Sequence, residues 1–250
     1  MGFLDFLFDK ETKERRKYAK LRKTLTNMYV QPSERSYAIQ QLRDLATEEA
    51  VDVLLARYGD NAPNTTVDIE EKEYVYDVLV LLGQETDVDV VGVVREHLRN
   101  TEENVNWPMK VLSDLLDFEE FTTFLAELLS DCTTDYVQNP EKKQELILRA
   151  TEIKDEAVAK ALVRFLADAN ETIRFLAVTA CLAQERDDLY EDTFIDLLED
   201  EESIRIVNKL VEAFYDRPEW KIPEEQREAV ERALPEEYGI HNKGHIYKHR

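Results

Sequence analysis

The chain has 250 residues, with a hydrophobic fraction of 43%, a charged fraction of 34%, and only six glycines and seven prolines. So few turn-forming residues argue against a sandwich or barrel and favour a helical protein of one large or two small domains. The formal net charge of -22 repels phosphate backbones, which argues against general nucleic-acid binding. An acidic surface of this kind also occurs in proteins that only need to be soluble or that function at high salt concentration.

The chain opens with an apolar stretch, MGFLDFLF, followed by a basic one, KETKERRKYAKLRK. Apolar residues then recur at spacings of three and four, which predicts an amphipathic helix with its cations outward. The stripe consists of Tyr18, Leu21, Leu25, Met28 and Tyr29. Such a helix can cap an array of helices, so residues 1–32 are predicted to form a capping segment.

The apolar residues before this helix leave two interpretations open. They can fold over the end of the helical array, or they can insert into a membrane interface while the cations meet anionic headgroups. The candidate membrane contacts are Phe3, Leu4, Phe6, Leu7, Phe8, Arg15, Arg16 and Lys17. No apolar run approaches the ~20 residues that a membrane span needs.

Residues 33–236 contain a repeated unit of two helices. In residues 167–202, one helical face carries Ile173, Ala177 and Cys181, and after a polar break a second face carries Phe194 and Leu198. Comparable units begin at Ser33, Asp68, Asn104, Asn139 and Glu201. A matching apolar position recurs about every 31 to 37 residues, as in helical-hairpin repeats. The sequence therefore predicts an all-α protein, an α-solenoid of about six hairpins with an N-terminal capping helix.

These units resemble the HEAT-repeat family. The segment DANETIRFLAVTACL, from Asp168 to Leu182, is similar to the family's pattern of an acid, a V/I-Arg pair, and then Ala and Leu at helical spacing. The segments from Ser33 and Glu202 echo part of the pattern, and the resemblance covers about residues 33–215. It implies a curved α-solenoid that serves as a protein-binding scaffold.

The aligned second helices share one position on the solvent side. It recurs as Arg57, Glu96, Glu127, Arg164 and Asp196. The resemblance implies that second helices line the concave face, and alternating charges suit a protein or peptide groove better than a track for a polyanion. A solvated face with no partner is the alternative.

Two long connections and two aromatic residues are further candidates for partner contact. The connections are GDNAPNTTV after the first hairpin and DCTTDYVQNPE after the third, and insertions of this kind often form the binding edge of a repeat array. Trp107 and Tyr136 are the candidate exposed aromatic residues, with packing against a neighbouring helix as the alternative.

The histidines and cysteines do not form a recognisable catalytic or metal motif. His97 aligns with the apolar Phe165 and is expected to be structural. In residues 237–250, the spacing of four between histidines would suit a metal site on a helix, but the glycines there favour a flexible or strand-like basic tail. These histidines are His241, His245 and His249. Cys132 and Cys181 share no metal-ligand spacing and fit a reducing compartment.

The sequence thus predicts a cytoplasmic, non-enzymatic scaffold or adaptor that binds another protein and uses no cofactor, metal or nucleic acid. A peripheral membrane adaptor that uses the N-terminal segment is the first alternative. A HEAT-like enzyme, a lyase or hydroxylase, is the second, although the chain has no glycine-rich phosphate loop, G-x-S-x-G or H-E-x-x-H motif.

Overall fold

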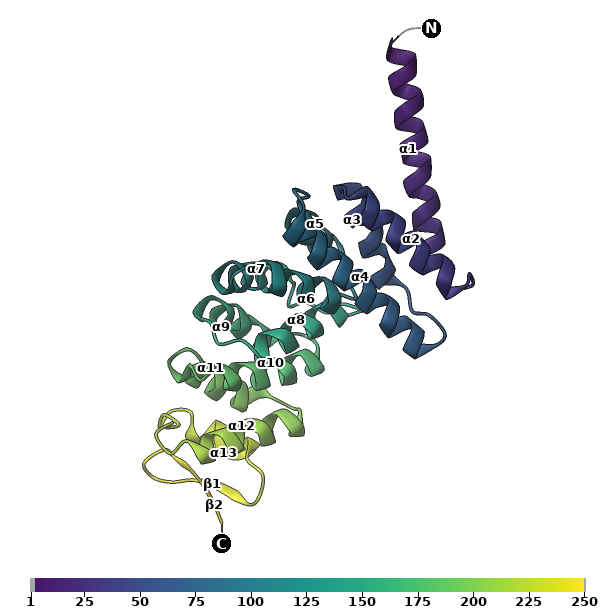
Figure 1. Cartoon of the computed structure of the whole chain (residues 1–250). Coiled ribbons are helices and arrows are strands. Elements are labelled where there is room, and N and C mark those ends of the chain that lie inside the picture. The colour runs from purple at the N-terminus through teal and green to yellow at the C-terminus, as the bar shows by residue number, and fades with distance from the viewer. Residues whose placement is uncertain (1–2, 250) are drawn as a thin grey trace. The chain divides into compact units, whose positions relative to one another are not determined.

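A computed structural model describes the backbone of residues 3–249 and the side chains of residues 12–249. The protein is all-α apart from one short pair of strands near its C-terminus. It divides into two compact units, Met1–Phe121 and Thr122–Arg250, and the boundary falls inside helix α7, Phe118–Asp131 (Figure 1).

The first unit consists of six further helices and one 3-10 turn. They are α1 (Phe3–Leu25), α2 (Pro32–Leu45), α3 (Glu48–Leu55), η1 (Ala56–Gly59), α4 (Thr65–Glu85), α5 (Val90–Asn100) and α6 (Asn106–Leu115). Side-chain caps set several helix starts: Thr47 accepts from the Ala50 amide and Asn64 from the Val67 amide. Each cap satisfies a backbone donor that the first helical turn leaves without an intrahelical partner.

Helices in this unit pack both on their sequence neighbour and on the next helix but one. Helix α2 contacts α3 and α4, α4 contacts α5 and α6, and α3 contacts α5. The core consists of apolar residues at helical spacing, for example Ile39 and Leu42 of α2 and Leu79 of α4, all fully buried. The prediction that this region is helical is therefore confirmed.

Among the described side chains of helix α1, from residue 12 onward, the buried ones lie in the last turns. Tyr18, Leu21 and Leu25 are buried, and the helix packs on α2 and α3. The Tyr18 hydroxyl hydrogen-bonds the Thr47 hydroxyl at 2.8 Å. Figure 1 shows the beginning of α1 extending away from the other helices of its unit. The predicted stripe was wrong at its last two positions, because α1 ends at Leu25. Met28 is half-buried in the turn that follows, and Tyr29 is 97% exposed.

A buried network of charged side chains joins α2, η1 and α4. Glu71 accepts hydrogen bonds from Arg35 at 2.8 Å and from Arg57 at 3.0 Å. Arg57 also donates to Asp68 at 2.7 Å, and Lys72 pairs with Asp68 at 2.9 Å. Buried charges need such partners, because an unpaired one pays its full desolvation cost. The network therefore fixes how these three elements lie against one another.

The second unit continues with further helices and ends in a β-hairpin. Its elements after α7 are α8 (Glu141–Thr151), α9 (Glu156–Leu162), η2 (Val163–Ala167), α10 (Glu171–Gln184), α11 (Asp187–Asp200), α12 (Ile204–Asp216), α13 (Arg227–Ala233), β1 (Tyr238–Ile240) and β2 (Ile246–Lys248). Helix α10 packs on α8 and α12, and α11 packs on η2 and α13.

Cations early in the helices of this unit pair with acids just before the next helix but one. Lys143 of α8 pairs with the buried Asp168 at 2.6 Å, and Arg174 of α10 pairs with Glu201 at 2.8 Å. Asp168 and Arg174 are two residues of the segment that carries the HEAT resemblance. Their structural role here is to tie a helix to the start of the next helix but one through hydrogen-bonded ion pairs.

The histidine-containing tail forms an antiparallel pair of strands, as the strand-like alternative predicted. Tyr238 pairs with Lys248 and Ile240 with Ile246. The rings of His241 and His245 stack at the turn with their centroids 4.5 Å apart. Gly244 adopts a φ of +91° there, a conformation that suits glycine in a tight turn.

Candidate functional site

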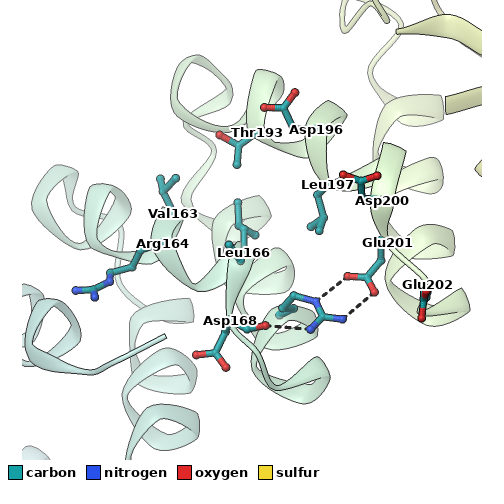
Figure 2. A pocket seen from close by; sticks show the side chains of 12 residues that line it. Val163, Arg164, Leu166, Asp168, Thr193, Asp196, Leu197, Asp200, Glu201 and Glu202 are labelled. Carbon is teal, nitrogen blue, oxygen red and sulfur yellow. Dashed lines mark hydrogen bonds and ion pairs between the residues drawn. The ribbon is translucent and has the colours of Figure 1, made fainter. Parts of the chain in front are cut away.

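A pocket of about 490 Å³ opens in the second unit between η2, α10, α11 and the connection from α11 to α12. Figure 2 shows the side chains around it. Its size falls within the range of ~300–1,000 Å³ that is usual for ligand pockets. It is therefore a concave site of the size that a side chain or short segment of a partner could enter.

Aliphatic side chains form the base of the pocket. Leu166 of η2 is 2% exposed, and Val163 of η2 and Leu197 of α11 are half-buried. Figure 2 shows Leu166 and Leu197 approaching the hollow from opposite sides. Helix α9 continues into the 3-10 helix η2, which has three residues per turn. Val163 and Leu166 are three residues apart and therefore lie on the same side of η2.

An ion pair forms one wall. Arg174 donates from Nε to Glu201 at 2.8 Å and from Nη2 to the second oxygen of the same carboxylate at 2.9 Å. Its Nη1 donates to the Asp168 carbonyl at 2.9 Å. The hydrogen bond to Glu201 raises the pKa of Arg174 above its ordinary value. Every nitrogen of this guanidinium therefore already has a partner.

The other cation beside the pocket is directed elsewhere. Arg164 donates to the Ser130 carbonyl, and Figure 2 shows its guanidinium turned away from the hollow. Asp168, at the opposite side, is neutralised by Lys143. Arg174 and Lys143 are thus paired with acids of the protein, and the guanidinium of Arg164 is not directed into the pocket.

Three carboxylates at the rim have no cationic partner among the described side chains. Asp196 and Asp200 lie one turn apart on α11, and Glu202 follows in the connection to α12; all three are exposed. Asp196 accepts one hydrogen bond, from the Gln226 amide at 3.0 Å. Among residues 12–249, no lysine, arginine or histidine forms an ion pair with any of the three. The rim is therefore negatively charged above an apolar base.

The structure places two of the predicted contact residues, Arg164 and Asp196, at this pocket. Glu127 is exposed on α7 in the same unit, and Glu96 is exposed on α5 in the first unit. The pocket also includes residues that the alignment of second helices did not select, namely Leu166, Leu197, Asp200 and Glu202. The acidic run at the end of α11 was the only sign of them in the sequence.

The prediction that Arg57 faces solvent was wrong. Its side chain is fully buried in the ion-pair network of the first unit, where it donates to Asp68, to Glu71 and to the Asp60 carbonyl. The acids on α4 draw the guanidinium inward, and a buried guanidinium with these partners is unavailable to another protein. Arg57 is therefore a structural residue.

The two candidate aromatic residues differ in their surroundings. Trp107 is half-buried and stacks on Tyr58, with ring centroids 6.0 Å apart and planes 3° apart, as the packing alternative predicted. Lys110 lies over its ring at 5.2 Å. Tyr136, in the connection from α7 to α8, is 72% exposed. Of the two, only Tyr136 presents most of its ring to solvent.

The candidate membrane contacts lie on α1. The backbone from Phe3 onward is helical, whereas the side chains of Phe3, Leu4, Phe6, Leu7 and Phe8 lie outside the described residues. Arg15, Arg16 and Lys17 are exposed. Among the described residues, no helix combines the length and apolar character needed to cross a bilayer.

The cysteines and histidines form no cluster that could hold a metal ion, as far as residues 12–249 show. Cys181 is buried in α10, and burial raises the pKa of its thiol well above the ordinary value. A search of protein-family models, of curated proteins and of solved structures returns no match for this chain. The functional interpretation therefore depends on the geometry of the pocket.

Proposed function

We propose that this chain is a non-catalytic helical-repeat scaffold that binds another protein, and that the pocket between η2 and α11 is part of its binding surface. The observation that carries the proposal is a concave site with an apolar base and an unneutralised charged rim on the exposed side of α11. A concave site lined by apolar side chains with a few charged groups beside them is typical of binding sites.

The arrangement of helices supports a HEAT-like α-solenoid as the frame for this site. Within each unit, helices pack on the next helix but one, as α4 does on α6 and α10 does on α12. The ion pairs Lys143–Asp168 and Arg174–Glu201 repeat one type of link, between a helix and the start of the next helix but one. Repeated neighbour contacts of this kind are the physical basis of a solenoid, whose surface can diverge while its core persists.

The proposal is tested by site-specific photocrosslinking of the full-length protein in its native lysate. A photoreactive benzoylphenylalanine at Ala167, an exposed residue of the pocket, should crosslink one protein in high yield. The same group at Asn208, an exposed residue on α12 outside the pocket, is the matched control. Crosslinking of the same proteins from both positions, or of none, would overturn the proposal.

A second candidate function, a peripheral membrane adaptor, is favoured by helix α1. Its apolar residues and its exposed cations lie on one continuous helix, and the beginning of that helix extends away from α2 and α3 (Figure 1). Apolar and basic groups on one helix suit an interface rich in anionic lipid.

Vesicle flotation tests this second function. The full chain should float with phosphatidylserine-containing vesicles at low salt, and the triple variant Arg15→Gln, Arg16→Gln, Lys17→Gln should float less. Vesicles of phosphatidylcholine alone provide the control for the electrostatic part of the interaction. Failure of the full chain to float with either vesicle would exclude this function.

A further inference from the structure

We propose that the pocket between η2 and α11 recognises an extended basic segment of a partner protein, whose arginine or lysine side chains enter it. This inference rests on the proposed scaffold function and specifies the partner's chemistry. It follows from three properties of the pocket: its charge, the lining of its base and the spacing of its acids.

The charge of the pocket selects a cation. Asp196, Asp200 and Glu202 have no cationic partner in the described part of the chain, whereas Arg174 is saturated by Glu201 and the Asp168 carbonyl. An anionic ligand would find no free donor on Arg174 and would meet three negative charges. A guanidinium or ammonium would instead find carboxylate acceptors.

The base of the pocket suits the aliphatic part of such a side chain. Val163, Leu166 and Leu197 offer an apolar surface directly beside the carboxylates. Arginine and lysine side chains can bury their methylene stems on such a surface while the charged end reaches polar groups. A small inorganic cation would leave this apolar surface uncovered.

The spacing of the acids suits an extended peptide. Asp196 and Asp200 are four residues apart on one helix, so their side chains project about 6 Å apart. In an extended chain, side chains on the same face are two residues apart, at about 6.6–6.8 Å. A segment with basic residues at alternate positions can therefore place one cation beside each acid.

Hydrogen bonds within the protein already position the acidic side chains in the walls of the pocket. Arg174 holds Glu201 at the start of the connection to α12, and Gln226 holds Asp196 through its amide. Lys143 holds Asp168 on the opposite side. Groups that are already fixed lose little conformational entropy when a ligand binds, which favours specific recognition.

Fluorescence anisotropy with a synthetic peptide tests this inference directly. The probe is a fluorescein-labelled nonapeptide with arginine at three alternate positions and leucine between them. A second peptide with citrulline in place of arginine keeps the shape and removes the charge. The full-length protein should bind the arginine peptide and should bind the citrulline peptide about tenfold more weakly or worse.

A matched pair of variants separates the pocket from general attraction to an acidic protein. Asp196→Asn combined with Asp200→Asn should weaken binding of the arginine peptide about tenfold. Glu73→Gln combined with Asp77→Asn removes two exposed acids with the same spacing from α4 in the first unit, and should change binding less than about twofold. Circular dichroism should show equal helix content for both variants.

Four outcomes would overturn the inference. Equal weakening by both double variants would show non-specific attraction, and equal binding of the citrulline peptide would show that charge is not recognised. Spermine that binds the pocket as tightly as the peptide would assign the site to a small polycation. In the photocrosslinking experiment, a partner segment at Ala167 without basic residues would overturn this inference alone, whereas the absence of any crosslinked protein would overturn the scaffold function.

Discussion

At the scale of single residues, the buried carboxylate of Glu71 holds two guanidinium groups, and removing its charge should strongly destabilise the fold. Arg35 and Arg57 are 2% and 0% exposed and both donate to it. We expect Glu71→Gln to lower the free energy of unfolding by about 3–5 kcal/mol, because two buried cations lose a counter-charge. Urea unfolding followed by circular dichroism measures this change.

Arg43→Gln is the control for this prediction. It removes an exposed ion pair, since the side chains of Arg43 and Asp44 are 36% and 63% exposed. Solvent screens such a pair, so its loss should change the free energy of unfolding by less than about 1 kcal/mol. If Glu71→Gln cost no more than Arg43→Gln, the buried network would contribute little to stability.

A second prediction at this scale concerns pH and the carboxylate of Glu171. Its hydrogen bond from Arg205, together with one from Ser203, lowers the pKa of Glu171 from 4.5 to about 2. Because the folded-state pKa is the lower one, the stabilisation is fully present above about pH 4.5 and is lost as the pH falls toward about 2. The Glu171 side chain is 39% exposed, and solvent screens such a charge. We therefore expect the ion pair to contribute less than about 1 kcal/mol to the free energy of unfolding.

Urea unfolding of the wild-type protein and of Glu171→Gln over a pH series measures this effect. The difference in unfolding free energy between them should be constant near neutral pH and should shrink as the medium becomes acidic. Arg205→Gln should behave in the same way, because it removes the partner that lowers the pKa. A difference that stays constant down to about pH 3 would contradict the assignment.

At the scale of the elements, Gln184 links α10 to the turn between α8 and α9. Its amide donates to the Ala150 carbonyl at 2.8 Å and to the Ile153 carbonyl at 2.6 Å, and its carbonyl accepts from the Asp155 amide at 3.3 Å. Gln184→Leu leaves these buried backbone groups without their partner, so we expect a loss of about 2–3 kcal/mol in unfolding free energy.

Thermal and urea unfolding of Gln184→Leu measure this loss, with Asn208→Leu as the control. Asn208 is exposed on α12, and substitution of an exposed residue usually has little effect on stability. Asn208→Leu should therefore change the free energy of unfolding by less than about 0.5 kcal/mol. Equal effects of the two substitutions would show that the helix–turn link is dispensable.

The helices could be predicted because each shows its own apolar period, but the direction of individual charged side chains could not. Arg57 and Arg164 both occupy the second position of a 3-10 turn after a second helix, yet the first is buried and the second exposed. The tertiary partners differ: Arg57 donates to Asp68 and Glu71 of α4, whereas Arg164 donates to the Ser130 carbonyl and forms no ion pair with an acid of the described chain. Helical periodicity carries no information about such partners.

The pocket could be predicted only in part for a similar reason. The alignment of second helices selected Asp196 and Arg164. Leu166 lines the pocket because η2 packs on α11, and Glu202 lines it because of the path of the connection to α12. A concave site made by three helices and a connection depends on how those elements pack. The sequence showed only that the end of α11 is rich in acids.

At the scale of the whole molecule, the excess of acidic groups should make stability depend on salt. The chain has 54 aspartates and glutamates against 32 lysines and arginines. Repulsion among exposed acids opposes the folded state and is screened when the Debye length falls from about 10 Å at 0.1 M salt to about 3 Å at 1 M. Exposed ion pairs weaken too, but the uncompensated acids outnumber them.

We therefore expect the midpoint of urea unfolding to rise when the sodium chloride concentration increases from about 0.1 M to about 1 M. The slope of the unfolding free energy against urea concentration should stay unchanged. The variant with Glu73→Gln and Asp77→Asn should show a smaller rise, because two exposed acids one helical turn apart no longer repel each other. The ion pairs around Glu71 are buried and so are screened far less than exposed ones. A midpoint that falls with salt would show instead that attraction between exposed opposite charges outweighs repulsion among the acids.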